Sequence, residues 1–393
     1  MKKYSLAILQ THATQFDGPL FRLIAEHPDI DLTVYYTRNQ AHCLSYDPEL
    51  NRQSGWDHDI TTGYKACFFP ISIFKRLSLV NNIVKSGGYD LVIVSGYNSW
   101  LTLAIPILGK YYGTAVGLRA DSVFTYRQVN LKWMLKDVLL PILFRLYATG
   151  HPTGSLTRTV MQQYGMQDSA LFYFPYAIDN DYLKLQADKI TPNKNIKRHS
   201  MGICKDDFVV LGVLKFVPRE DPLTLLDAYS LLTKQYPQVH LILVGDGSLM
   251  PDINRQIKEL GLTNVHLPGY LPYSKLADFY TIADVFVHPA KIEQWGCSVN
   301  EAMVCGLPVI AADTVGAGAD LIEQGKTGFV YIAGQPVLLA EKLEKLIKDP
   351  ALTKSMGFCA SAHIANWGYA KTLEQTLLAL DFIRNKHNKL ENS

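Results

Sequence analysis

Two glutamates, Glu293 and Glu301, lie eight residues apart in a segment whose residue types suit the binding of a phosphorylated sugar. A strand-length apolar run at 284–288 precedes them, so we expect Glu293 in a loop and Glu301 in the helix that follows. Amides at the start of a helix, together with the helix dipole, favour an anion such as a diphosphate. The carboxylate of Glu301 is expected to accept hydrogen bonds from the vicinal hydroxyls of a ribose or a hexose. The helix start is expected at three small residues, Gly296, Cys297 and Ser298.

Both glutamates also have interpretations that need no ligand. Ser298 and Glu301 fit the Ser-x-x-Glu pattern of a capping box, in which two side chains satisfy free amides at a helix start. Glu293 on its own is typical of a solvated loop charge. The two glutamates therefore leave a ligand site and an ordinary helix start open, and the surrounding string of residues decides between them.

The longer string at 289–320, PAKIEQWGCSVNEAMVCGLPVIAADTVGAGAD, resembles the signature of glycosyltransferase family 4, in which seven residues separate two glutamates. Here the motif reads Glu293-QWGCSVN-Glu301. Shorter matches extend the resemblance over most of the chain: LKFVPR at 214–219, VGDG at 244–247, LPGYL at 267–271 and FPYAID at 174–179. The resemblance implies a GT-B fold, which is an α/β fold with two doubly wound Rossmann-like domains facing across a cleft. It also implies a retaining transferase that moves a hexose-type sugar from a nucleotide-diphosphate sugar to an acceptor hydroxyl, in surface polysaccharide or glycoconjugate synthesis.

The resemblance implies a role for each matched residue. Glu293 would contact the transferred sugar, and Glu301 would hold the ribose of the nucleotide. Lys215 would neutralise the leaving diphosphate, on which bond cleavage builds negative charge. Without the family context, Lys215 is interpreted as an exposed lysine at a strand end. Further donor contacts are implied for Arg219, Gly245, Leu271, Gly296, Cys297 and Ser298.

One position departs from the family pattern. The family places a second basic residue five positions after Lys215, where this chain has Glu220, and Arg219 is the candidate substitute. If Arg219 does not substitute, the phosphate site is weakened, which keeps a non-catalytic sugar-nucleotide or polysaccharide-binding subunit as a rival hypothesis. A nucleotide-sugar epimerase of the same fold is a second rival, although no acid/base set for elimination is evident. The retained pair of Glu293 and Glu301 favours the transferase.

Strand-length apolar runs alternate with helix-length segments along the chain, which predicts parallel sheets covered by helices. The polar stretch at 186–205 is interpreted as a linker between an acceptor-binding domain, 1–185, and a nucleotide-sugar-binding domain, 206–360. For the closing helices at 361–393, a return to the first domain is left open. Strands are expected at 4–9, 32–36, 90–95, 114–118 and 171–174 in the first domain. In the second domain they are expected at 209–214, 240–244, 265–267, 284–288, 308–312 and 328–331.

The first domain is expected to select the acceptor. Its strand at 114–118 leads into Arg119 and Asp121, which are interpreted either as contacts in the cleft or as members of a structural ion pair. After the first strand, the loop and helix start contain one glycine, Gly18, where related enzymes often have a glycine-rich loop. These three residues are the acceptor-side candidates.

Composition excludes several classes of protein. Lys and Arg number 38 against 36 Asp and Glu, so the formal net charge of +2 gives no basic footprint for nucleic acid. The six cysteines have no metal-ligand spacing, and we expect reduced thiols, no metal and no cofactor. Because the sequence has no apolar stretch of spanning length and no signal-peptide pattern, a cytoplasmic protein is expected.

The segment at 129–147, VNLKWMLKDVLLPILFRLY, combines large apolar side chains with Lys132, Lys136 and Arg145. This composition fits peripheral contact with an anionic membrane surface, and it also fits a buried core helix interrupted by Pro141. A membrane-linked acceptor would favour the first interpretation. The expected partners are therefore a nucleotide-sugar donor and a glycan or lipid-linked acceptor, with peripheral contact at the inner face of a membrane left open.

Overall fold

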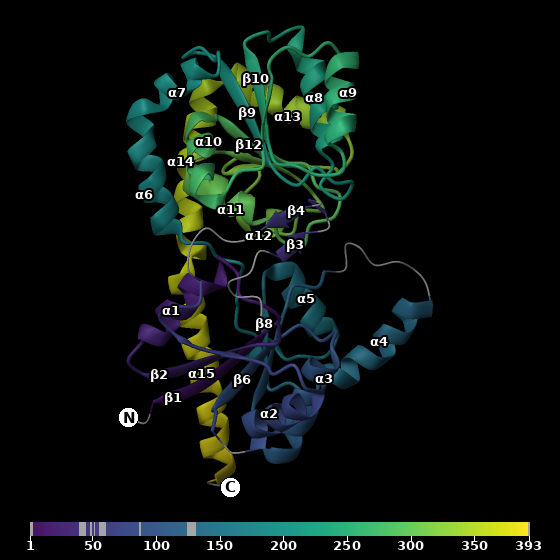
Figure 1. Cartoon of the computed structure of the whole chain (residues 1–393), viewed down its shortest axis with the longest axis vertical. Helices are drawn as coiled ribbons and strands as arrows, with labels where there is room; N and C mark the ends of the chain where they lie inside the picture. Colours follow the sequence, from purple (N-terminus) through teal and green to yellow (C-terminus); the bar gives the residue numbers. More distant parts are fainter. Residues whose placement is uncertain are drawn as a thin grey trace. The chain divides into compact units, whose positions relative to one another are not determined.

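The computed structural model describes residues 3–38, 45–47, 49–50, 52–54, 60–85, 88–123 and 131–391. The chain divides into two compact units, which Figure 1 shows in one view. Unit 1 combines Met1–Cys43, His58–Ala177 and Tyr369–Ser393, and unit 2 combines Leu44–Asp57 and Ile178–Gly368. Each unit is thus assembled from segments that lie far apart in the sequence.

In its described part, unit 1 contains a six-stranded parallel sheet with the strand order β5-β2-β1-β6-β7-β8 (Figure 1). The central strands are almost entirely apolar and buried, as expected for a parallel sheet that helices cover on both faces. The strands are β1 (Tyr4–Gln10), β2 (Ile30–Tyr36), β5 (Lys65–Phe68), β6 (Leu91–Ser95), β7 (Val116–Ala120) and β8 (Thr149–Pro152). The helices of this unit are α1 (Asp17–Glu26), α2 (Ile73–Lys85), α3 (Trp100–Tyr112), α4 (Leu131–Phe144), α5 (Ser155–Gln163) and α15 (Tyr369–Glu391).

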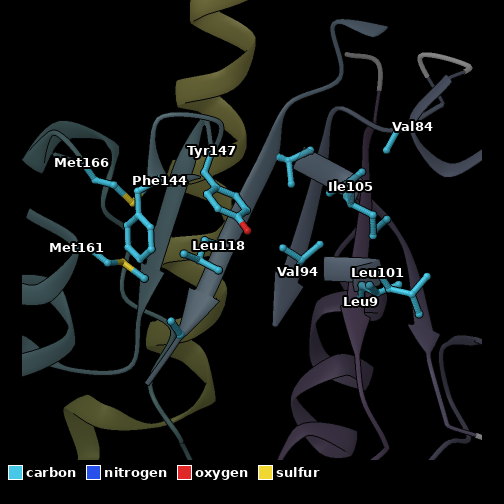
Figure 2. Packing of buried hydrophobic residues seen from close by; sticks show 14 of the residues in the cluster. Leu9, Val84, Val94, Leu101, Ile105, Leu118, Phe144, Tyr147, Met161 and Met166 are labelled. Atoms are coloured by element: carbon cyan, nitrogen blue, oxygen red, sulfur yellow. The ribbon is translucent and has the colours of Figure 1, made fainter. Parts of the chain in front are cut away.

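Two clusters of buried apolar side chains hold this sheet to its helices. One cluster joins the strands to α2, α3, α4 and α5, and Figure 2 shows Leu101 and Ile105 of α3 and Phe144 of α4 among its members. The other joins the strands to α1 and to α15, whose Leu380 and Ile383 are buried in it. The C-terminal helix is therefore part of the core of unit 1.

The predicted strand at 171–174 is the one expected strand that does not form. Leu171 makes a single parallel bridge to Gly150, after a short 3-10 turn at Asp168–Ala170. Phe172 and Phe174 each donate one backbone hydrogen bond to β8, but the segment adds no ladder to the sheet. Conversely, β5 and β8 were not expected, because their sequences KACF and TGHP lack a continuous apolar run.

The described part of unit 2 contains a second six-stranded parallel sheet, with the order β11-β10-β9-β12-β13-β14. All six strands predicted in this half are present, with ends displaced by at most two residues. They are β9 (Phe208–Val213), β10 (Val239–Val244), β11 (Val265–Gly269), β12 (Val285–His288), β13 (Val309–Ala312) and β14 (Gly328–Tyr331). Its helices include α8 (Pro222–Thr233), α9 (Met250–Glu259), α10 (Tyr273–Ile282), α11 (Cys297–Val304), α12 (Gly318–Leu321), α13 (Pro336–Lys348) and α14 (Pro350–Ile364).

The stretch at 186–205 is largely helical rather than an irregular linker. It contains the end of α6 (Asn180–Ile190), a 3-10 turn and α7 (Lys194–Ser200), all within unit 2. Three of the basic residues that indicated a solvated linker are in ion pairs: Lys194, Lys197 and Arg198. Buried Arg198 donates to the carbonyl of Ile282 and to the carboxylate of Asp284. Since these pairs attach the helices to unit 2, the first boundary lies at Ala177 and Ile178, and the chain leaves unit 2 after Gly368.

A short antiparallel hairpin from the first half of the chain also belongs to unit 2. Its strands are β3 (Ser45–Asp47) and β4 (Arg52–Ser54), with Asp47 opposite Arg52. Asp47 Oδ1 accepts the backbone amides of Glu49 at 2.9 Å and Leu50 at 3.3 Å, which orders the turn, and Leu50 is buried. The predicted first domain of 1–185 thus contributes a segment to unit 2.

Candidate functional site

The point where the winding direction of the unit 2 sheet reverses lies between β9 and β12. These strands are neighbours, but the chain continues from β9 to β10 on one side and from β12 to β13 on the other. In doubly wound sheets, ligands bind at the carboxyl ends of the strands beside such a point. Lys215 and Arg219 follow β9, and Glu293 follows β12. The structure thus brings together the residues for which the sequence predicted sugar and diphosphate contacts.

Arg219 connects the two loops at this point. Its Nη1 lies 3.2 Å from Glu293 Oε2, and its carbonyl accepts the amides of Lys291 at 2.8 Å and Ile292 at 3.1 Å. A guanidinium held by both loops presents its donors in a fixed planar array, which matches carboxylate and phosphate oxygens. Arg219 thus lies between the loops that follow β9 and β12, next to Glu220 in the chain.

Glu220 turns inward and organises this loop. Its side chain is 8% exposed; Oε2 accepts the backbone amide of Lys215 at 2.7 Å, and Oε1 lies 2.8 Å from Arg219 Nη2. Burial raises the pKa of Glu220 to about 7, although the Arg219 cation and the hydrogen bond from the Lys215 amide oppose the shift. Glu220 therefore supports Lys215 and Arg219 and is not a free negative charge in the site.

The hairpin places two more carboxylates on the same cations. Lys215 Nζ lies 2.8 Å from Asp47 Oδ2 and 2.7 Å from Glu49 Oε2. Glu49 also accepts two hydrogen bonds from Arg219, at 2.8 Å from Nε and 3.0 Å from Nη2. The bonds from Arg219 are the main reason that the pKa of Glu49 falls to about 2. These acids were missed from the sequence because they lie about 170 positions from their partners, with no local pattern that links them.

The loop after β12 depends on two glycines. Gly296 has a φ of 96°, and a Cβ there would lie 3.1 Å from the ring of His288 and from Val315. A Cβ on Gly316 would lie 1.9 Å from the carbonyl oxygen of Gln294, because the Gly316 amide donates to the carbonyl of Glu293. The loop is therefore packed tightly against its neighbours, and the backbone of Glu293 is fixed by the hydrogen bond from Gly316. The side chain of Glu293 is 21% exposed.

The capping-box interpretation of Ser298 and Glu301 is wrong. Gly296 is the N-cap of α11, no side chain caps it, and Cys297 is the first helical residue. Glu301 is therefore the fifth residue of the helix, beyond the reach of the free amides. The residue is 4% exposed, and its carboxylate accepts a 2.6 Å hydrogen bond from the hydroxyl of Tyr280 on α10. Burial raises the pKa of Glu301 to about 7, and the bond from Tyr280 opposes this shift.

Gly245 is required by the backbone of the neighbouring loop. A Cβ at Gly245 would lie 1.9 Å from the carbonyl oxygen of Leu214, and its φ is 151°. The chain after β10 is thereby pressed against the loop that carries Lys215. Leu271 follows β11, which lies two strands from β9 at the edge of the sheet. Gly245 and Leu271 were both predicted to contact the donor. Gly245 borders the loop that carries Lys215, whereas Leu271 follows the edge strand β11.

His288, the last residue of β12, borders the loop that carries Glu293 and Gly296 and was not singled out from the sequence. It is buried, and within the described residues its Nδ1 has no hydrogen-bond partner. Burial lowers the pKa of His288, so its imidazole is neutral near pH 7. The ring packs against Gly296. A polar residue at the carboxyl end of a buried strand is the signal that identifies it.

The acceptor-side candidates lie in unit 1 and have structural partners there. Arg119 is 5% exposed, pairs with Asp17 at 3.0 Å, and has its guanidinium 4.4 Å from the ring centroid of Phe174. Asp121 accepts a hydrogen bond from Tyr176 at 3.1 Å. Arg119 is thus a member of a structural ion pair, and its partner is Asp17.

Gly18 lies inside α1, where it allows a close contact between two parts of the chain. A Cβ at Gly18 would lie 2.6 Å from the carbonyl oxygen of Ile60. Close packing against Ile60 therefore accounts for a glycine at this position without a ligand, which the sequence alone did not indicate.

Comparison with known proteins gives a family match for the segment that holds the candidate site. Residues 193–360 match the family model for glycosyl transferases group 1, and this range covers β9 to β14 and both glutamates. This part of the chain is therefore similar to glycosyl transferases group 1. The match includes the loops with Lys215, Arg219 and Glu293, whose geometry was described above.

Named relatives of the chain are glycosyltransferases. A D-inositol 3-phosphate glycosyltransferase of Paenarthrobacter aurescens is 32% identical over 194 residues, which are 48% of this chain and 47% of the relative. The chain spans about half the length of this and other curated relatives that it matches. A GDP-mannose-dependent alpha-(1-6)-phosphatidylinositol monomannoside mannosyltransferase of Mycolicibacterium smegmatis is 28% identical over 376 residues, or 91% of each chain.

Solved structures confirm the fold class. Anabaena HepE in complex with UDP superposes with a TM-score of 0.72 at 20% identity, over 97% of this chain and 100% of that one. A glycosyltransferase from Rickettsia africae gives a TM-score of 0.75 at 17% identity, over 98% and 99% of the two chains. The predicted α/β GT-B class, with two doubly wound Rossmann-like domains, is thereby shown.

The described residues contain no group of three or more His, Cys, Asp and Glu side chains arranged to hold a metal ion. In the same part of the chain, every helix is too short or too polar to cross a membrane.

Proposed function

We propose that the protein is a retaining glycosyltransferase that moves a hexose-type sugar from a nucleotide-diphosphate sugar to an acceptor hydroxyl. The observation that carries the proposal is the position of Arg219, whose guanidinium lies 3.2 Å from Glu293 on the neighbouring loop of the switch point. A cation for a diphosphate and a carboxylate for a sugar are thereby adjacent, in the segment that matches the group 1 family model. Relatives named as glycosyltransferases support the same class.

In the proposed reaction, the bond between the anomeric carbon and the diphosphate oxygen breaks, and its electron pair stays on the diphosphate. Lys215 and Arg219 stabilise the charge that develops there. The acceptor oxygen forms its new bond on the same face of the sugar, and its proton passes to an oxygen of the leaving phosphate. Glu293 contacts the sugar and fixes its orientation, and Glu301 holds the ribose of the nucleotide. No protein base and no metal or cofactor are required by this scheme.

The inward orientation of Glu220 favours catalysis over a non-catalytic binding subunit. A free glutamate beside the diphosphate would repel it, but the Glu220 carboxylate is engaged by the Lys215 amide and by Arg219. The second cation that the family places at this position is instead supplied by Arg219. The departure in sequence thus leaves two cations at the proposed phosphate site.

The proposed partners are a nucleotide-sugar donor and a glycan or lipid-linked acceptor of surface polysaccharide or glycoconjugate synthesis. UDP in the Anabaena structure and the GDP-mannose dependence of the Mycolicibacterium relative support a donor of this type. The proposed location is the cytoplasm, with peripheral contact at the inner face of the membrane through α4. Five apolar side chains of α4 are exposed in support of this contact: Met134, Leu135, Val138, Leu139 and Ile142.

A panel of UDP- and GDP-sugars tests the activity. Each donor is incubated with wild type, Glu293→Gln and the control Asp168→Asn, which removes an exposed charge in unit 1. Release of nucleoside diphosphate from one donor is expected in wild type and control, and loss of that release is expected in Glu293→Gln. Binding of UDP or GDP without turnover of any donor in the presence of lipid and glycan acceptors would instead support the binding subunit.

A further inference from the structure

The β3–β4 hairpin presents carboxylates to the cations of the proposed phosphate site. Asp47 Oδ2 and Glu49 Oε2 lie 2.8 and 2.7 Å from Lys215 Nζ. Both oxygens of Glu49 also accept from Arg219, at 2.8 and 3.0 Å. The same two side chains thereby neutralise both of the cations that follow β9.

This arrangement resembles the binding of a phosphate group. Guanidinium and ammonium groups bind carboxylate and phosphate oxygens with the same short, charge-assisted hydrogen bonds, and paired oxygens suit the planar guanidinium. Among the described residues, the structure gives the ammonium group of Lys215 no carboxylate besides Asp47 and Glu49. A diphosphate that takes these cations must therefore displace the hairpin carboxylates.

The hairpin is built to hold its acids in place. Asp47 uses one oxygen to accept the amides of Glu49 and Leu50, and this leaves its other oxygen for Lys215. Leu50 is buried and anchors the turn. The turn is thus held both by local hydrogen bonds to Asp47 and by the ion pair that fixes the Asp47 carboxylate on Lys215.

The contact is also suited to reversible release. The fractional side-chain exposure is 20% for Asp47, 35% for Glu49 and 32% for Lys215. Ion pairs that remain accessible to water contribute little free energy each, because the water competes for the charges. A diphosphate with more than one negative charge is therefore able to replace them.

We propose that the β3–β4 hairpin is an internal competitor of the sugar donor, in which Asp47 and Glu49 occupy Lys215 and Arg219 until a nucleoside diphosphate group displaces them. The inference rests on the proposed function, because it assigns these two cations to the diphosphate. It adds a regulatory contact, since only the fraction of molecules with the hairpin released binds donor. The apparent affinity for the donor is reduced by that fraction.

The test compares nucleotide affinity with and without the hairpin charges. UDP and GDP are titrated calorimetrically into wild type, into Asp47→Asn/Glu49→Gln, and into the control Asp188→Asn/Glu323→Gln. The control removes the same charge from two exposed acids of unit 2 that pair with Lys184 and Lys326. Asp47→Asn keeps an oxygen for the turn, so the hairpin can still fold. The hairpin variant is expected to bind the preferred nucleotide roughly three- to tenfold more tightly than wild type, with the control within about twofold of wild type.

Hydrogen exchange of the hairpin amides gives a second measurement on the wild-type chain. Exchange in the segment that contains the Glu49 and Leu50 amides is expected to increase when the preferred nucleotide is added, because the hairpin leaves its partners. Equal or weaker nucleotide binding by the hairpin variant, or exchange that is unchanged by nucleotide, would overturn the hairpin proposal and leave the transferase proposal standing. Absence of UDP and GDP binding in every variant would overturn both.

Discussion

The hydroxyl of Tyr280 donates a 2.6 Å hydrogen bond to the carboxylate of Glu301, and both side chains are buried. The bond joins α10 to α11 and fixes the direction of the second glutamate of the motif. Burial disfavours the charged form of a carboxyl group, which is why burial raises the pKa of Glu301 to about 7. Stability should therefore respond to the ionisation of this residue.

Glu301→Gln is expected to make stability less sensitive to pH. The pKa of Glu301 is about 7 in the folded protein against an ordinary value of 4.5, so the folded state keeps a proton that the unfolded state releases. Its contribution is therefore present below pH 4.5 and is lost as pH rises from 4.5 to 7, by about 3 kcal/mol at most. Thermal unfolding at pH 5.5 and pH 8 should show a smaller fall in melting temperature for the variant. Glu220, whose pKa is also raised to about 7 by burial, leaves a residual fall in both proteins.

Arg219→Lys is expected to lower kcat/KM by roughly a hundredfold, because one preorganised donor to a developing charge contributes on that scale. Lysine keeps a positive charge beside buried Glu220, but it loses the planar array that reaches Glu293 and Glu220 together. Steady-state kinetics with the active donor measures the effect. Arg255→Lys on α9, an exposed residue whose partner is the half-buried Asp252, is the control and should keep wild-type kinetics. Equal kinetics for the two variants would remove Arg219 from the phosphate site.

Asp17→Asn is expected to destabilise unit 1 by about 3–5 kcal/mol, because it leaves the buried Arg119 cation without its carboxylate. Arg119 is held between Asp17 and the ring of Phe174, so water cannot replace the lost partner. Asp168→Asn, which removes the exposed partner of Arg158, should cost less than about 1 kcal/mol. Urea unfolding followed by a probe in unit 1 measures both. A small effect at Asp17 would show that Arg119 does not depend on the pair, and would return it to the acceptor candidates.

The sequence predicted the strands of unit 2 better than those of unit 1. Runs such as VFVH of β12 and VIAA of β13 are buried on both faces, so hydrophobicity alone marks them. In unit 1, the short strand TGHP of β8 is as fully buried but contains no Val, Ile, Leu or Phe, and its burial comes from tertiary packing that no local pattern reports. The same limit explains why 186–205 was predicted to be a linker. The charge of Arg198 indicated a solvated segment, but in the fold Arg198 is buried and pairs with Asp284.

The site was predictable in part. The spacing of Glu293 and Glu301 and the strands before them placed both loops at the switch point. The direction of each side chain depends on distant partners: Tyr280 for Glu301, and Asp47 for Lys215. These contacts join elements that are separated by 21 and 168 residues, so they become visible only in the folded chain.

The exposed face of α4 is expected to bind anionic membranes. Leu140 and Phe144 are buried in the core of unit 1, but Leu135 and Leu139 on the same helix are 55% and 60% exposed, with Lys136 between them. An apolar helix face beside basic side chains binds an anionic bilayer by insertion and by charge attraction.

Wild type should co-sediment with vesicles containing phosphatidylglycerol, and less with neutral phosphatidylcholine vesicles. Leu135→Ser/Leu139→Ser should lose most of this binding without loss of nucleotide affinity. Phe358→Ser, which removes a single exposed aromatic of unit 2, is the control and should bind as wild type does. Vesicle binding that is equal in all three proteins would mean that α4 is not the contact.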